Sequence, residues 1–359
     1  MPAGAIPISS ATRAAISSSR TWASDLKDPR GLDLLKRLVA SADVFVENYR
    51  PGTLDRLGLG YAALSAINPR LVYCSVSAFG HTGPMASRAG FGLIAEAMSG
   101  AMAMVGVPGE PPPLLRMPVA DMYSGSHAAT AICAPLYGRQ ASGRGQHIDI
   151  ALYDCMVSMH DYAIQCYTMS GGREIPVQTG YDLPNSTIYG IFPARDGYLV
   201  IAAQVDDAWQ KLARLVGGEA LAADPRFLTP DVRNANREPA LAAVRAWTMA
   251  QESAAACIAA LDKAGVPAAP VQRIDEVLED PQVKARGMII EQDHPVLGRV
   301  RLANTPFRFS DADVTPKRPA PLLGQHNAVI AREAGLGEAE IAGMVKDGVL
   351  YAEAAATQA

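Results

Sequence analysis

The stretch LVYCSVSAFGHTGP, residues Leu71–Pro84, decides the predicted fold. Its first seven residues form a short apolar run that ends in a turn with glycine and proline, as buried strands commonly do. A second strand is predicted at Ala42–Val46, and helices are predicted at residues 29–40 and 54–64. Helices that alternate with strands at this spacing indicate βαβ units and a parallel sheet, which makes this an α/β chain.

The turns after these two strands are candidate binding elements. They are Asn48–Gly52 and Phe79–Pro84. Ligands of parallel sheets bind beyond the carboxyl ends of the strands, and both turns lie there. The sequence therefore predicts a ligand site at this edge of the sheet.

The middle of the chain continues the alternation of helix and strand. A helix is predicted at Phe91–Met104, a second around Asp121, and a strand at Gly143–Leu152. The next predicted helix, Tyr153–Tyr167, carries apolar residues that are expected to pack in the core: Met156, Met159, Ile164 and Cys166.

A small α+β domain is predicted after a linker at Ser170–Leu183. Strands at 188–192 and 198–202 flank an Asp-Gly turn, which indicates a hairpin, and helices follow at 208–216, 239–250 and 252–264. The chain is predicted to be helical again from Asn327. The predicted organisation is an unassigned segment (1–20), a large domain (21–175), the linker and small domain (176–275), and a return to the large domain (276–359).

Composition excludes several classes of protein. The 359 residues are 49% hydrophobic and 19% charged, and the formal net charge is -4, which gives no case for nucleic acid or an anionic membrane as partner. No apolar run is long enough for a membrane span.

Five cysteines without paired spacing predict reduced, mostly buried thiols in a cytoplasmic protein. The six histidines show no metal-ligand spacing, so no metal site is predicted.

Asp121 is the candidate catalytic residue. Small and apolar residues follow it with helical spacing, so it is expected at the start of a helix, where the dipole favours an ionised carboxylate. Such a carboxylate can cap the helix as its N-cap residue. It can also attack an activated acyl group. Local sequence alone favours the cap.

An ordered series of motifs resembles the class III CoA transferases, the group of the carnitine-CoA and formyl-CoA transferases. The series extends over roughly residues 20–350, and its order makes it specific although each piece is weak. The matching stretches are residues 25–31, 42–44, 47–52, 56–58, 68–73, 79–84, 119–121, 143–149, 196–197, Trp209 and 323–326.

The resemblance implies a fold and an activity. The expected fold is a Rossmann-like large domain built from both chain ends, with the small domain inserted between them, in an interlocked homodimer. The expected reaction moves CoA from an acyl-CoA donor to a small carboxylic acid, with CoA as a substrate and no permanently bound cofactor. Asp121 would attack the donor thioester and form first an aspartyl anhydride and then an aspartyl-CoA thioester.

The resemblance also implies CoA-binding residues. Asn48 and Tyr49 match the family's turn beside the nucleotide, Arg56 matches a phosphate-side arginine, and Arg88 lies near a position that is often basic. The alternative for each arginine is a solvated surface charge. A loop with glycines helps catalysis in formyl-CoA members, but Ala202–Gln204 lacks the glycines, so no role is carried over to it.

Two departures from the family leave alternatives open. An acyl-CoA racemase would need a histidine where this chain has Phe91, and His81 and His127 are out of register with that position. Family members also begin with a strand, a turn and a helix, for which residues 1–19 offer no strand pattern. Either the true start lies upstream, or the chain is an inactive, truncated paralogue that only binds acyl-CoA.

Overall fold

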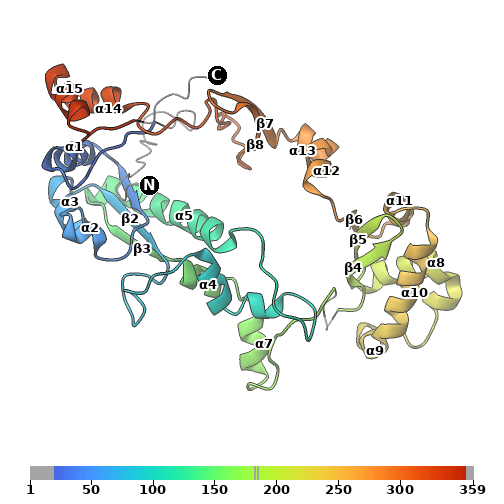
Figure 1. Cartoon of the computed structure of the whole chain (residues 1–359). Coiled ribbons are helices and arrows are strands. Elements are labelled where there is room, and N and C mark those ends of the chain that lie inside the picture. Colours follow the sequence, from blue (N-terminus) through green and yellow to red (C-terminus); the bar gives the residue numbers. More distant parts are fainter. Residues whose placement is uncertain (1–19, 182, 184–185, 353–359) are drawn as a thin grey trace. The chain divides into compact units, whose positions relative to one another are not determined.

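The computed structural model describes residues 20–181, 183 and 186–352 (Figure 1). The chain divides into two compact units. Unit 1 comprises residues up to 98, 117–159 and from 278 onward, and unit 2 comprises 99–116 and 160–277. The predicted unassigned segment 1–20 lies outside the described residues except for Arg20. Within the described residues, no helix is long and apolar enough to cross a membrane.

Unit 1 is built on a parallel sheet, as the alternation of helices and strands predicts. The strand order is β1 (Val44–Glu47), β2 (Val72–Ser77) and β3 (His147–Ala151). Val44 pairs with Val72, and Tyr73 pairs with His147, so the carboxyl ends of the three strands lie at one edge. The prediction of an α/β fold with a parallel sheet is confirmed.

The helices of unit 1 bury apolar side chains on this sheet. Asp28 caps the predicted first helix by accepting a hydrogen bond from the backbone N–H of Arg30 at 2.8 Å. The core also takes in the predicted C-terminal helices, because Ile330 and Met344 join one cluster with Leu35 and Tyr73. The helices around this core are α1 (Pro29–Ala40), α2 (Thr53–Arg56), α3 (Tyr61–Ile67), α14 (Asn327–Glu333) and α15 (Glu338–Lys346).

The long helix α5 (Val119–Ser142) packs against β2 and β3, and α4 (Gly92–Met98) and α6 (Leu152–Ser158) pack against α5. The predicted single helix at 91–104 is wrong at its end. It stops at Met98, and after Gly100, whose φ is 89°, only a 3-10 turn follows at Met102–Met104. Glycine adopts this backbone conformation without steric cost.

The predicted helix at 153–167 is also wrong in extent. It is two helices, α6 and α7 (Ala163–Met169), and the chain passes from unit 1 to unit 2 between them. Met156 is buried as predicted, but Met159 and Ile164 are exposed and Cys166 is half-buried. Their apolar spacing continues across the break, so periodicity alone could not reveal it.

Unit 2 contains the predicted hairpin, formed by β4 (Tyr189–Ala194) and β5 (Gly197–Ala202), which pair antiparallel. A third strand, β6 (Ala268–Pro270), pairs with β5. Trp209 and Phe227 are fully buried in the core of this unit. Its other helices are α8 (Asp206–Ala222), α9 (Pro230–Ala235), α10 (Arg237–Ala250) and α11 (Ala254–Ala264).

A second hairpin in the return segment was not predicted. It consists of β7 (Ile289–His294) and β8 (Gly298–Ala303), and it follows the short helices α12 (Ile274–Glu279) and α13 (Pro281–Ala285). Its strands carry several charged residues, and no Asn-Gly or Asp-Gly pair marks its turn. The hairpin therefore lacks the signals by which strands are found in a sequence.

Candidate active site

Asp121 lies in the first turn of α5, but it is not the N-cap residue. Pro118 occupies that position, without a side-chain cap, and Asp121 is the third residue of the helix. The interpretation of Asp121 as an N-cap is therefore wrong. Among the described residues, no hydrogen bond or ion pair holds its exposed carboxylate.

Gly92, the first residue of α4, makes room for the Asp121 carboxylate. A Cβ atom added to Gly92 would lie only 2.1 Å from Oδ2 of Asp121 and 3.0 Å from its Cγ. No residue larger than glycine fits there while the carboxylate keeps its position. Gly92 carries no signal of a site residue in the sequence, because its role depends on the contact between α4 and α5.

A second acid, Glu96, lies in the same helix as Gly92. It is only 3% exposed, and its Oε1 accepts a hydrogen bond from the backbone N–H of Ala120 at 3.2 Å. Glu96 therefore binds the residue that precedes Asp121. Glu96 was not predicted as a site residue, because nothing in the local sequence distinguishes it from an acid on a solvated helix face.

Phe91, His81 and His127 are the residues that bear on racemase chemistry. Phe91 precedes Gly92 and is 81% exposed. His127 hydrogen-bonds through Nδ1 with the carbonyl oxygen of Tyr123, one turn earlier in α5, at 3.0 Å. His81 lies in the segment after β2, where its backbone N–H donates to Asp149 at 2.9 Å. Position 91, where a racemase would need its base, carries the phenyl ring of Phe91, which cannot transfer a proton.

The predicted turn after β1 leads into α2 and is hydrogen-bonded to the neighbouring strand β2. Nδ2 of Asn48 donates to the carbonyl oxygen of Val76 at 2.6 Å, and the backbone N–H of Tyr49 donates to Oε2 of Glu47 at 2.7 Å. Gly52 takes the left-handed conformation, with a φ of 78°, as α2 begins. The turn thus presents Asn48 and Tyr49 at the carboxyl edge of the sheet. Burial, and then the charge of Glu47, raise the pKa of Tyr49.

The two predicted basic residues are both exposed and lie on different segments. Arg56 ends α2, and its Nη2 donates to Oγ1 of Thr53 at 3.3 Å, so it belongs to the turn region. Arg88 follows β2, and its guanidinium lies 5.6 Å from the centre of the Phe79 ring. Asn48, Tyr49 and Arg56 thus lie on one segment, the turn after β1 and the helix α2 that follows it, whereas Arg88 contacts Met85, Met98 and Phe79.

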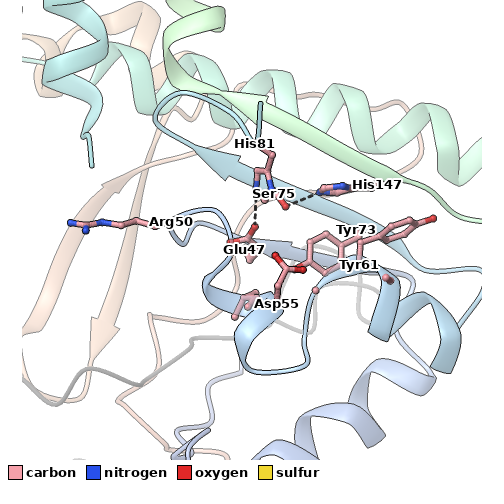
Figure 2. Close-up of a pocket in the computed structure, with 12 residues that line it drawn as sticks. Glu47, Arg50, Asp55, Tyr61, Tyr73, Ser75, His81 and His147 are labelled. Carbon is pink, nitrogen blue, oxygen red and sulfur yellow. Dashed lines mark hydrogen bonds and ion pairs between the residues drawn. The ribbon is translucent and has the colours of Figure 1, made fainter. Parts of the chain in front are cut away.

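A polar cavity of about 120 Å³ opens beside this turn (Figure 2). Oε1 of the buried Glu47 lies 3.9 Å from Nε2 of His81, and Nε2 of His147 lies 2.9 Å from Oγ of Ser75. Arg50 points away from these side chains in Figure 2. Acids, imidazoles and aromatic rings predominate among the residues that line the cavity, which are Glu47, Arg50, Gly52, Leu54, Asp55, Gly60, Tyr61, Ala62, Tyr73, Ser75, His81 and His147.

Burial controls the ionisation of the groups around this cavity. Burial, and then the neighbouring His81, lower the pKa of His147, so its neutral form is favoured. Burial raises the pKa of the Cys74 thiol to about 11. His147 therefore accepts or donates a hydrogen bond as a neutral ring.

Within the described ranges, no group of three or more His, Cys, Asp or Glu side chains could hold a metal ion.

Comparison with known proteins identifies the family. The model of CoA-transferase family III matches residues 9–327. Succinyl-CoA–D-citramalate CoA-transferase from Chloroflexus aurantiacus is 38% identical over 320 residues, which cover 89% of this chain and 79% of that protein. Succinate–glutarate CoA-transferase from Agrobacterium fabrum is 36% identical, with 88% of this chain and 78% of that protein covered.

Solved structures agree with the sequence comparisons. A CAIB/BAIF family protein from Brucella suis has a TM-score of 0.77 and 40% identity, with 87% of this chain and 80% of that chain covered. Rv3272 from Mycobacterium tuberculosis has a TM-score of 0.73 and 28% identity, with 85% and 79% covered. The family model, the relatives and the solved structures all agree with the parallel-sheet fold. The chain therefore belongs to family III of the CoA-transferases and is an enzyme of that class.

Proposed function

We propose that Asp121 is the nucleophile of this CoA-transferase. Its exposed carboxylate in the first turn of α5, accommodated by Gly92, is the observation that carries the proposal. A free carboxylate can act as a nucleophile, and covalent catalysis divides one difficult exchange into easier steps. A carboxylate engaged in an ion pair or in capping its own helix would be less available.

The proposed reaction proceeds through covalent intermediates at Asp121. A carboxylate oxygen of Asp121 attacks the thioester carbon of the donor, the C–S bond breaks, and CoA leaves as a thiolate, so that a mixed anhydride of Asp121 and the donor acid remains. The thiolate attacks the aspartyl carbonyl, releases the donor acid and forms an aspartyl-CoA thioester. The acceptor carboxylate attacks that thioester, and the displaced thiolate then takes the acceptor acyl group, which frees Asp121 again.

We propose that the donor is succinyl-CoA and the acceptor a small dicarboxylic acid. The names of the relatives support this, because they specify succinyl-CoA or succinate together with D-citramalate, glutarate or mesaconate. A further relative from Acetobacter aceti is named acetyl-CoA:oxalate CoA-transferase, which shows that donors vary among relatives. A panel of these acids with succinyl-CoA is therefore the first assay.

CoA is proposed to bind at the turn after β1. Asn48 and Tyr49 would contact the nucleotide, and the exposed guanidinium of Arg56 can pair with a phosphate. Arg88 is proposed as a further phosphate contact, supported by its exposure alone. No other cofactor is proposed.

Three further features of the family are proposed for this chain. Residues 176–275, which lie within unit 2, would be the small domain inserted into a Rossmann-like large domain, and the assembly of unit 1 from both chain ends supports this. The protein would act as an interlocked homodimer. It would reside in the cytoplasm. All five cysteines are free thiols, and most of them are buried, as predicted: Cys74, Cys155 and Cys257 are buried, whereas Cys133 is exposed.

Trapping with hydroxylamine tests the proposed nucleophile. The wild-type protein, incubated with succinyl-CoA and then hydroxylamine, should carry a hydroxamate at Asp121, located by peptide mass spectrometry. Asp121→Asn should carry none and should transfer no CoA. Asp154→Asn is the matched control, because Asp154 is the exposed third residue of α6. An active wild-type protein without modification at Asp121 would exclude the proposal.

A further inference from the structure

Glu96 has no part in the CoA site proposed above, yet it is an almost fully buried acid. Burying a carboxylate costs free energy unless hydrogen bonds replace its hydration. The side chain of Glu96 is 3% exposed and points at the first turn of α5, where it accepts the hydrogen bond from the Ala120 N–H. Its burial therefore needs an explanation at the start of α5.

The start of α5 lacks the usual local cap. The first backbone N–H groups of a helix have no partner within the helix, and a Ser, Thr, Asp or Asn at the N-cap normally supplies one. Here the N-cap residue is Pro118, which supplies none. Oε1 of Glu96 satisfies the N–H of Ala120 from a different helix, so the position of the first turn of α5 depends on α4.

Gly92 and Glu96 act on neighbouring residues from one face of α4. They are four residues apart in the helix, so their positions lie one above the other. Gly92 leaves space for the Asp121 carboxylate, and Glu96 binds the backbone of the residue before it. Glu96 thus holds the backbone beside the proposed nucleophile, and Gly92 provides the space that its side chain occupies.

We propose that Glu96 is a positioning residue that holds the first turn of α5 so that Asp121 points at the donor thioester. The inference rests on the proposed role of Asp121. In this role Glu96 acts through the backbone of Ala120 and not on the substrate itself. Its effect should therefore appear in the rate of acyl transfer to Asp121 and not in the affinity for acyl-CoA, because it acts on the geometry of attack.

Substitution of Glu96 separates this role from a purely structural one. Glu96→Met keeps the length of the side chain but removes the acceptor, and it should lower both kcat and the rate of hydroxamate formation by about 10- to 100-fold. The KM for succinyl-CoA should stay within about twofold of the wild-type value. Glu96→Gln retains an acceptor oxygen and should restore kcat to within about threefold of wild type.

Each outcome decides the inference. Trapping at the wild-type rate in Glu96→Met, a raised KM with unchanged kcat, or a Gln variant as slow as the Met variant overturns it. If circular dichroism shows that Glu96→Met does not fold, Glu96→Asp replaces it. The Asp side chain is one methylene group shorter, so its carboxylate lies farther from the N–H of Ala120, and kcat should also fall. An active wild-type protein that is not trapped at Asp121 overturns the proposed function as well; normal trapping in the Met variant overturns this inference alone.

Discussion

Gly92→Ala is expected to disable Asp121 without unfolding the protein. The added Cβ would lie 2.1 Å from Oδ2 of Asp121. Carbon and oxygen atoms that are not bonded need a separation of about 3.2 Å, so the carboxylate must retreat by about 1 Å. A misplacement of about 1 Å in a reacting group can cost about 100-fold in rate, which corresponds to about 2.7 kcal/mol of barrier.

The stability of the variant should not fall. The atom that must move is the end of the Asp121 side chain, and the nearest other atom, Cβ of Ala120, is at an ordinary contact distance of 3.5 Å. Alanine is also a better helix former than glycine, by at most about 1 kcal/mol. The free energy of unfolding should therefore stay unchanged or rise by up to that amount.

The assay compares Gly92→Ala with Gly138→Ala. Gly138 is an exposed residue in α5, and nothing lies within 4 Å of a Cβ added to it. Gly138→Ala should keep wild-type CoA transfer from succinyl-CoA, whereas Gly92→Ala should lose about 100-fold in kcat and in hydroxamate formation at Asp121. Full activity of a folded Gly92→Ala variant would refute the reasoning that this space positions the nucleophile.

Two other predictions concern stability in unit 1. Arg139→Met should lower the free energy of unfolding by about 2–3 kcal/mol in urea titrations, because the buried guanidinium donates to the backbone and carboxylate of Asp43; an unchanged midpoint would contradict this. The pKa of His147 is lower in the folded chain than its ordinary value of about 6.5. As the pH falls through about 6.5, the unfolded chain therefore binds more protons than the folded chain, and the free energy of unfolding decreases. His147→Gln should reduce this loss between about pH 7 and about pH 5 in urea titrations, whereas an unchanged slope would contradict the linkage. The pKa of His326 is lowered as well, so part of the slope should remain.

The sequence predicts those parts of the fold whose signals are local. Asp28 and Pro29 mark the start of α1, short apolar runs mark β1 and β2, and the Asp196-Gly197 pair marks the hairpin of unit 2. The sequence does not predict the helix ends that depend on the division of the chain into two units. The helices predicted at 91–104 and 153–167 end where the chain passes between units, and nothing in their apolar spacing changes there.

The sequence by itself determined the family and drew attention to Asp121, because an ordered series of motifs is specific even where each piece is weak. Only the tertiary structure decided that Asp121 is not the cap of its own helix. Pro118 takes the cap position, while Gly92 and Glu96, from a helix earlier in the chain, provide the space for its carboxylate and the hydrogen bond beside it. Contacts between residues so far apart leave no periodic or local signal, and they become visible only when the two helices pack together.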